Sequence, residues 1–397
     1  LVIEHPWQSV RYLNDIPIER PFAIFMIVVA FFSGKFRIVS SPTNKWVYSL
    51  LALHFLLAPF AFSVEYAIDQ SVEYAKMVSL YLLMLSVAED EEALKMLVKA
   101  YVFSMLFFMF HSLWEYSNGR HEWRMGISRM VGADFTDPNA FGASVVLSIP
   151  FVYVLFCIKP SAWVKRLLFC YFPIAVICVV LTGSRTSFVA LIFLLALWVI
   201  QKKGSRKIVL LVVASLAVCF LWASMPVEKQ DRIRTLWDKD AGPANAQQSA
   251  QGRLQGFKVS WEMFKREPLT GVGVGGKNFI GYRMAHEIDD VGHESPTQAH
   301  VLYGQVLAEQ GVFGGILFCG LVVSVMRSAI VVWRTKNGED NFYSLMSRAI
   351  LASLLLLLLL GFGGHNFYRP LWLWLAAWSG AMLGLVKRQG KTVIYAE

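Results

Sequence analysis

The sequence predicts an all-α polytopic membrane protein, and three observations support this prediction. The mean hydropathy of the 397 residues is +0.49, and 56% of them are hydrophobic, which is rare in a soluble domain. Only 16% of the residues are charged, and these lie in short stretches between apolar runs. The apolar runs recur along the chain and are long enough to cross a bilayer as helices. The net charge of +9 does not indicate nucleic-acid binding, because the basic residues are dispersed among the loops.

The lengths of the apolar runs predict about eleven transmembrane helices. The first run, 21–34, is short, and the chain begins Leu1-Val2 without an initiator Met. We therefore expect a missing N-terminal piece with one more span, which makes about 11–12 in all. Asp137-Pro138 places an N-cap and a first-turn proline before the run at 139, which is a helix-start signal. The other candidate spans are 46–64, 72–88, 94–114, 139–158, 166–182, 187–201, 207–225, 312–333, 346–363 and 368–386.

The charges of the loops alternate along the chain and predict the orientation. One set of loops is basic, and the positive-inside rule places it in the cytoplasm. The loop 89–92 belongs to this set and is acidic, but the rule depends on Lys and Arg far more than on Asp and Glu. The basic residues of this set are Lys35, Arg37, Lys45, Lys159, Lys165, Arg166, Lys202, Lys203, Arg206, Lys207, Arg334, Lys336, Arg348, Lys387, Arg388 and Lys391.

The alternate loops are then extracytoplasmic, and they divide the chain into three parts. We expect N-terminal transmembrane helices in 1–225, a long extracytoplasmic region with short amphipathic helices in 226–311, and C-terminal transmembrane helices in 312–397. The predicted location is a bacterial inner membrane, crossed many times, with the active site on the periplasmic face. The extracytoplasmic loops are 65–71, 115–138, 183–186, 226–311 and 364–367.

Arg185 lies in a tight turn, Gly183-Ser184-Arg185-Thr186, between two apolar runs. A charge at such a junction either reaches the membrane interface as a helix anchor or meets a partner. We favour the second interpretation, an arginine that binds an anion, because hydroxyl side chains and a helix N-terminus beside it suit a phosphate.

Residues 253–266 have the periodicity of an amphipathic helix that lies on the membrane surface. Its apolar face carries Leu254, Phe257, Trp261 and Phe264. Arg253 is then either a functional residue or part of the solvated face. The glycines that follow, in 271–276, resemble a nucleotide-binding loop, but no strand–helix unit surrounds them, so a flexible turn is the better interpretation.

His300 precedes Tyr303 and Glu309 at the start of a span, and is either an interfacial histidine or a general base. We expect no metal at His286, His293 and His300, because metal-binding spacing is absent and the intervening residues break a helix. The five cysteines lie within apolar runs without a C-x-x-C spacing, so no disulfide or cysteine metal site is expected either.

His365 and Arg369 lie in a predicted outer turn between the last two spans. With the neighbouring aromatic residues they either form an ordinary interfacial belt or line the same cavity as Arg185. Both interpretations remain open from the sequence.

Three motifs together resemble the O-antigen ligase and O-antigen polymerase superfamily. They are Gly183-Ser184-Arg185-Thr186, then Gly252-Arg253 with Trp261 and Pro268-Leu269-Thr270-Gly271-Val272-Gly273, and finally Ala299-His300-x-x-Tyr303 followed by Glu309-x-Gly311-x-x-Gly314. No single motif is specific, and their order and their shared outer location carry the resemblance.

The resemblance implies a membrane glycosyltransferase of the GT-C type. It implies an undecaprenyl-diphosphate-linked glycan as donor, lipid A–core as acceptor for a ligase, inversion at the anomeric carbon, and no metal or other cofactor. It assigns the donor diphosphate to Arg185 and Arg253 and catalysis to His300. Tyr303, Glu309, His365 and Arg369 are then candidates for the cavity lining, and we expect a monomer surrounded by membrane lipids.

Three alternatives share some of these features. A polymerase that extends one lipid-linked glycan with another uses the same donor, and a protein-directed oligosaccharyltransferase shares the motifs but usually has a longer C-terminal region. A lipid transporter is of a different class, and it usually places charges near the midplane of broken helices, whereas the spans here are nearly free of charge. A structural scaffold does not need a charged residue such as Arg185.

Overall fold

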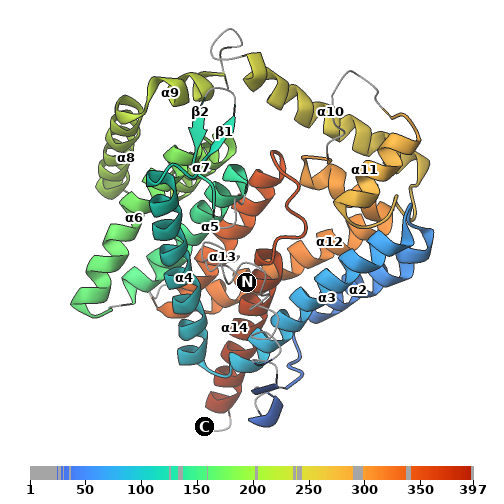
Figure 1. Ribbon diagram of the computed structural model, residues 1–397. Helices are drawn as coiled ribbons and strands as arrows, with labels where there is room; N and C mark the ends of the chain where they lie inside the picture. The colour runs from blue at the N-terminus through green and yellow to red at the C-terminus, as the bar shows by residue number, and fades with distance from the viewer. Residues whose placement is uncertain are drawn as a thin grey trace. The chain divides into compact units, whose positions relative to one another are not determined.

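The computed structural model describes residues 25, 28–29, 31–34, 37–124, 127–132, 137–158, 160–201, 204–235, 238, 244–288, 298–336 and 341–394. These residues are almost entirely helical (Figure 1). By their contacts the described residues fall into two compact units, one within 98–250 and the other within 25–97 and 251–394.

The first unit is built on helix α5, which packs against α6 and α7, while α7 also contacts α8. Asp137 caps α5 as the sequence predicts, since its side chain accepts hydrogen bonds from the backbone N–H groups of Asn139 and Ala140. A short antiparallel hairpin precedes α5. The elements are α4 (Glu91–Ser117, whose first residues belong to the other unit), β1 (Glu122–Arg124), β2 (Ile127–Arg129), α5 (Pro138–Cys157), α6 (Ala162–Thr182), α7 (Arg185–Ile200), α8 (Gly204–Ser224) and α9 (Val227–Arg234).

The second unit is centred on α12, which packs against α2, α13 and α14, and α3 packs against both α2 and α14. Gly311 interrupts α12 with a φ of 62° and a ψ of −160°, so a helical segment precedes the kink and a long apolar segment follows it. The elements are α2 (Asn44–Leu57), the 3-10 helix η2 (Ala58–Phe60), α3 (Val64–Val87), α10 (Ala244–Arg266), α11 (Gly276–Ala285), α12 (Leu302–Thr335), α13 (Phe342–Gly361) and α14 (Leu371–Ile394).

The predicted class is confirmed: the chain is an all-α polytopic membrane protein. Five helices among the described residues are long and apolar enough to cross a membrane, and two shorter apolar helices lie at Arg185–Ile200 and Lys207–Leu216. The predicted number of about 11–12 spans stays a prediction. The five are Glu91–Ser117, Pro138–Cys157, Ala162–Thr182, Leu302–Thr335 and Phe342–Gly361.

One predicted boundary is wrong. The sequence places a loop at 65–71, but α3 already begins at Val64. Pro59 lies in the short 3-10 helix that follows α2, and Ser63 caps α3 by accepting a hydrogen bond from the Tyr66 N–H group. The charged residues Glu65 and Asp69, which resemble a loop in sequence, therefore occupy the first turns of a helix.

Candidate functional site

The turn between α6 and α7 is fixed by local capping. Gly183 ends α6 in the left-handed conformation with a φ of 58°, which glycine adopts without strain. Ser184 then caps α7, because its hydroxyl accepts hydrogen bonds from the backbone N–H and the hydroxyl of Ser187. Arg185 is thus the first residue of α7, which begins two residues before the predicted span at 187–201, and its backbone is held on both sides.

The Arg185 side chain is buried, with 5% of its surface exposed. Its Nη1 donates to Thr235 Oγ1 at 2.7 Å, and the Thr235 hydroxyl donates to the Arg232 carbonyl oxygen at the end of α9. A helix anchor that reaches the interface would be exposed at its tip. The burial therefore argues against a helix anchor and shows that the Arg185 guanidinium meets a protein partner, and anion binding by Arg185 stays a prediction.

Two further cations bind the last carbonyl groups of α6. Arg129 Nε donates to the Thr182 oxygen at 2.9 Å, and Lys229 Nζ donates to the Leu181 oxygen at 3.0 Å. Cations at this position are favourable because the carbonyl end of a helix carries partial negative charge. Both contacts immediately precede the turn that carries Arg185, so they stabilise its position.

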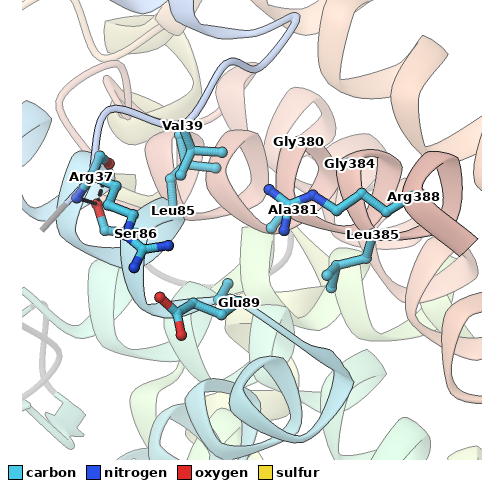
Figure 2. A pocket seen from close by; sticks show the side chains of 11 residues that line it. Arg37, Val39, Leu85, Ser86, Glu89, Gly380, Ala381, Gly384, Leu385 and Arg388 are labelled. Atoms are coloured by element: carbon cyan, nitrogen blue, oxygen red, sulfur yellow. Dashed lines mark hydrogen bonds between the residues drawn. The ribbon is translucent and has the colours of Figure 1, made fainter. Parts of the chain in front are cut away.

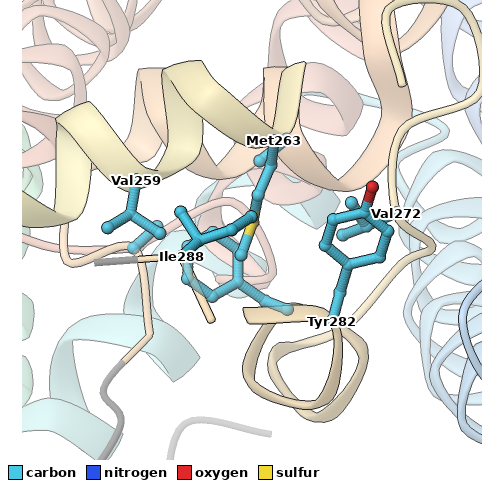
Figure 3. Close-up of a cluster of buried hydrophobic side chains, with 8 residues drawn as sticks. Val259, Met263, Val272, Tyr282 and Ile288 are labelled. Carbon is cyan, nitrogen blue, oxygen red and sulfur yellow. The ribbon is translucent and has the colours of Figure 1, made fainter. Parts of the chain in front are cut away.

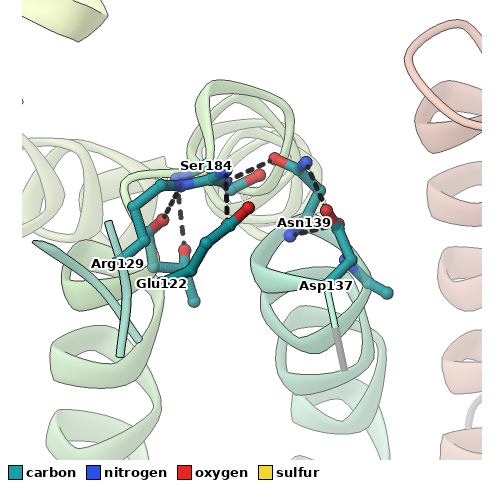
Figure 4. A network of polar contacts seen from close by, with 7 residues as sticks. Glu122, Arg129, Asp137, Asn139 and Ser184 are labelled. Carbon is teal, nitrogen blue, oxygen red and sulfur yellow. Dashed lines mark hydrogen bonds and ion pairs between the residues drawn. The ribbon is translucent and has the colours of Figure 1, made fainter. Parts of the chain in front are cut away.

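Arg129 also joins this turn to the beginning of α5 (Figure 4). Its Nη2 donates to Asn139 Oδ1 at 3.0 Å, and its Nη1 forms an ion pair with Glu122 Oε2 at 3.3 Å. Asn139 lies two residues after the capping residue Asp137. The hairpin, α5 and the α6–α7 turn are therefore connected through one fully buried guanidinium.

This unit buries more cations than carboxylates. Among its described residues, the buried charged side chains are four cations and one carboxylate, Glu115, which forms an ion pair with Arg120. Arg129 also pairs with the half-buried Glu122, and such a concentration of positive charge in one buried region suits an anionic ligand. The four cations are Arg129, Arg185, Lys229 and Arg232, with 0%, 5%, 4% and 6% of their surfaces exposed.

Lys229 shows the electrostatic consequence. Its pKa is lowered to about 8, mainly by burial and also by the nearby positive charge of Arg129, whereas Glu228 acts in the opposite direction. Its Nζ also lies 5.5 Å from the centre of the Tyr116 ring. Sequence reasoning missed Arg129 and Lys229 as site residues, although both lie in loops predicted to share the face of Arg185.

In the second unit, one face of α10 packs against the segment that carries His300. A Cβ atom on Gly256 would lie 2.3 Å from the Ala299 oxygen, and one on Gly304 would lie 2.7 Å from Ser260 Oγ. Arg253 precedes Gly256 by three residues and therefore shares this face of the helix. The half-buried Arg253 and His300 are thus carried by segments in direct contact.

The same face of α10 is buried further along the helix, and the predicted amphipathic face carries exposed apolar side chains. Val259 and Met263 point into a buried cluster with Val272, Tyr282 and Ile288 (Figure 3). The predicted membrane-facing residues Leu254 and Trp261 are 60% and 47% exposed. Trp261 and Phe264 contact each other, with ring centres 5.2 Å apart.

His300 has an unusual backbone conformation. Its φ is 50°, in the left-handed region that non-glycine residues rarely adopt, and its ring is half-buried. Such strain is often found at functional sites. The ring centre of the exposed His365 lies 5.3 Å away, so the structure brings together two of the predicted site residues.

The structure gives Tyr303 and Glu309 other contacts. The Tyr303 hydroxyl donates to the Leu358 oxygen on α13. Glu309 is 2% exposed, and its Oε2 accepts hydrogen bonds from the Gly275 N–H at 2.9 Å and from the Tyr368 hydroxyl. We therefore interpret both as residues that hold the fold around the site. The half-buried Arg369 lies in the same turn as Tyr368, where its N–H donates to the Asn366 oxygen.

The glycine-rich segment is not a flexible turn. The N–H groups of Val272 and Gly273 donate to the oxygens of Ala308 and Glu309, so the segment is bound along α12. A Cβ on Gly271 would lie 2.5 Å from the backbone of Gln310, which leaves no space for a side chain. The glycines allow this close approach.

Metal binding finds no further support in the structure. His286 is exposed and stacks on the Tyr282 ring at 4.0 Å, while His293 lies outside the described residues. Over the part of the chain that the structure describes, no three His, Cys, Asp or Glu residues are grouped so as to hold a metal ion.

The fold and these two clusters define a class: a polytopic helical membrane protein with buried cations at a helix–helix turn and a strained histidine in a second unit. Residues 170–319 match the family described as O-Antigen ligase, and this match confirms the resemblance to the O-antigen ligase superfamily. No curated protein matches the chain. The matched segment contains Arg185, Lys229, Arg253 and His300, and the match supports a glycosyltransferase-like enzyme of O-antigen ligation or polymerisation.

Proposed function

We propose that this protein transfers an O-antigen glycan from undecaprenyl diphosphate to lipid A–core on the periplasmic face of the bacterial inner membrane. The single observation that carries the proposal is the excess of buried cations around the α6–α7 turn, within the family match. A lipid diphosphate is the anion that an extracytoplasmic glycosyltransferase needs, because nucleotide sugars are not available outside the cytoplasm.

In this proposal, Arg185 and Arg253 bind the diphosphate of the donor. The bond between the anomeric carbon and the diphosphate oxygen breaks, and negative charge develops on that oxygen. Fixed guanidinium groups stabilise this charge, and each charge-assisted hydrogen bond contributes about 1.5–3 kcal/mol. Arg129 and Lys229 hold the turn of Arg185 and add positive potential beside it.

His300 acts as the general base in the same step. Its imidazole takes the proton of the acceptor hydroxyl while the acceptor oxygen bonds to the anomeric carbon from the face opposite the leaving group. The anomeric configuration is therefore inverted, and undecaprenyl diphosphate leaves. The reaction needs no metal in this scheme, so activity should survive an excess of chelator, and its loss there would contradict the scheme.

The deciding experiment supplies purified protein with an undecaprenyl-diphosphate glycan and either lipid A–core or additional donor. A lipid A–core product supports the ligase, whereas elongation of the donor glycan identifies a polymerase. A protein acceptor that is glycosylated in place of both identifies an oligosaccharyltransferase.

Two variants test the assigned roles. Arg185→Lys keeps the charge but loses the planar fork, and we expect it to lower transfer by at least about tenfold, which corresponds to about 1.4 kcal/mol. Arg234→Lys is the matched control, since the Arg234 side chain on α9 is 46% exposed and pairs with Asp231 on the surface. Full activity of Arg185→Lys would remove Arg185 from the site.

His300→Ala should abolish transfer while leaving donor binding intact, because the imidazole moves a proton and does not hold the diphosphate. His286→Ala is its control, since His286 is exposed at the end of α11. Transfer at the wild-type rate in His300→Ala would place the base elsewhere.

A further inference from the structure

A cavity with a partly charged lining lies in the second unit. None of the residues that line it has a role in the proposed glycosyl transfer. The cavity has a volume of about 200 Å³ and lies between the segment at Arg37, the end of α3 and the last turns of α14. Figure 2 shows the side chains of Arg37 and Arg388 reaching toward each other from opposite walls. Glu89 is the third charged residue of the lining.

The walls of this cavity are fixed by specific contacts. The Ser86 hydroxyl donates to the Arg37 oxygen at 2.7 Å and accepts from the Arg37 N–H at 3.3 Å, which ties this segment to α3. On the opposite wall, a Cβ on Gly380 would lie 2.1 Å from Ser41 Oγ, so α14 approaches the segment closely there. One turn later, a Cβ on Gly384 would meet nothing within 4 Å, so space is open at Gly384.

The lining combines positive charge with apolar surface. The two arginines exceed the one glutamate, and no ion pair or hydrogen bond of the Arg37 guanidinium or the Glu89 carboxylate is found with any other described residue. Leu85, Ala381 and Leu385 form an apolar part of the wall beside these charges. A ligand that fits must therefore carry negative charge next to hydrocarbon.

The surroundings indicate a lipid as the source of that ligand. Ile38, next to Arg37, is 79% exposed, and Phe32, shortly before it, is 83% exposed. Large apolar side chains at such exposure, beside the spans predicted from the sequence at 72–88 and 368–386, are suited to contact with acyl chains. Basic pockets between membrane helices commonly bind anionic lipid headgroups.

We propose that this cavity binds the phosphate of an anionic membrane lipid, such as phosphatidylglycerol, through Arg37 and Arg388. The acyl–glycerol part of the lipid lies along the apolar wall. In the orientation predicted from the loop charges, the site faces the cytoplasmic leaflet, where Arg37 and Arg388 both belong to the basic set of residues. The proposal does not depend on the glycosyl-transfer function.

The test uses the full chain, delipidated in a neutral detergent, with added phosphatidylglycerol or phosphatidylcholine. We expect phosphatidylglycerol to raise the melting temperature and to remain bound in native mass spectra, and phosphatidylcholine to do neither. Equal effects of the two lipids would overturn the proposal. So would an equal shift with inorganic phosphate, because that result would identify a soluble anion as the ligand.

Three variants identify the cavity as the place of binding. Arg37→Gln and Arg388→Gln should each weaken phosphatidylglycerol binding about tenfold, which corresponds to the loss of about 1.4 kcal/mol. Gly384→Leu fills the cavity within a helix that tolerates leucine better than glycine, and should abolish binding. Arg334→Gln removes an exposed arginine elsewhere in the basic set and serves as the charge control. Wild-type binding in both arginine variants would overturn the assignment.

Discussion

Glu309 offers a test of whether the structure assigns roles correctly, because the sequence alone makes it a candidate for the cavity lining. The carboxylate accepts hydrogen bonds from the Gly275 N–H and the Tyr368 hydroxyl, and so joins the glycine-rich segment and the last outer turn to α12. Glu309→Ala leaves the Tyr368 hydroxyl without its acceptor, whereas the Gly275 N–H keeps the Tyr368 oxygen as an acceptor at 3.0 Å. One unsatisfied donor costs about 1–3 kcal/mol, so the variant should lose about that much stability.

A double-mutant cycle with Tyr368→Phe separates the two hydrogen bonds. The single variant Tyr368→Phe loses one of them and should cost about 1 kcal/mol. In the double variant the tyrosine hydroxyl no longer exists, but the Gly275 N–H loses both of its acceptors, which costs about 1–3 kcal/mol. The cost of the double variant should therefore be smaller than the sum of the single costs, by about 1 kcal/mol.

The first measurement is the free energy of unfolding in detergent micelles, with circular dichroism as the probe. The second is the transfer activity of the folded protein. Glu309→Gln is the companion variant, since its amide oxygen can still accept a hydrogen bond, and it should retain substantial transfer. Two results would refute the interpretation: strictly additive stability losses, or a Glu309→Gln variant of normal stability that has lost transfer completely. The second result would make Glu309 a direct participant in the chemistry.

Three further predictions follow from the same contacts. Arg129→Met removes a buried guanidinium that binds Thr182, Asn139 and Glu122, and should cost about 3–5 kcal/mol of unfolding free energy, so a loss below about 1 kcal/mol would contradict the assigned role. Because the pKa of Lys229 is lowered to about 8, binding of inorganic pyrophosphate, measured by calorimetry, should weaken as the pH rises through 8, and Lys229→Arg should remove this dependence. Between pH 8 and the usual lysine pKa, Lys229 is deprotonated in the folded protein but still protonated in the unfolded chain. The free energy of unfolding should therefore increase with pH across this range. Gly311→Ala places a Cβ 2.4 Å from the Leu269 oxygen at a φ of 62° and should reduce the yield of folded protein, whereas Gly384→Ala, in open space, should not.

The sequence predicted those parts of the site that depend on local capping. Gly183 and Ser184 end one helix and begin the next for reasons that concern only their own backbone, so the position of Arg185 at the start of α7 could be found without a structure. The same holds for Asp137 at the start of α5. Apolar length likewise predicted the membrane helices well, because it depends on composition.

The supporting cations could not be found in this way. Arg129 and Lys229 bind carbonyl oxygens of residues about 50 positions away in the chain, and backbone carbonyls leave no mark in the sequence. The glycines of 271–276 were interpreted as a flexible turn for a related reason, since glycine serves both flexible turns and close packing. Only the contacts of Gly271 with α12 distinguish these two uses.

The buried cations also relate stability to function. Burial of four cations in one unit costs solvation free energy. The lowered pKa of Lys229 shows that this environment disfavours further positive charge. The carbonyl oxygens of Leu181 and Thr182 and the Glu122 carboxylate offset part of this cost. In the proposed function, the donor diphosphate adds negative charge here, so its binding should stabilise the fold while the fold holds the cations in place for the departing group. A site built in this way is rigid before the substrate arrives, because the same hydrogen bonds that orient the cations also end α6 and begin α7.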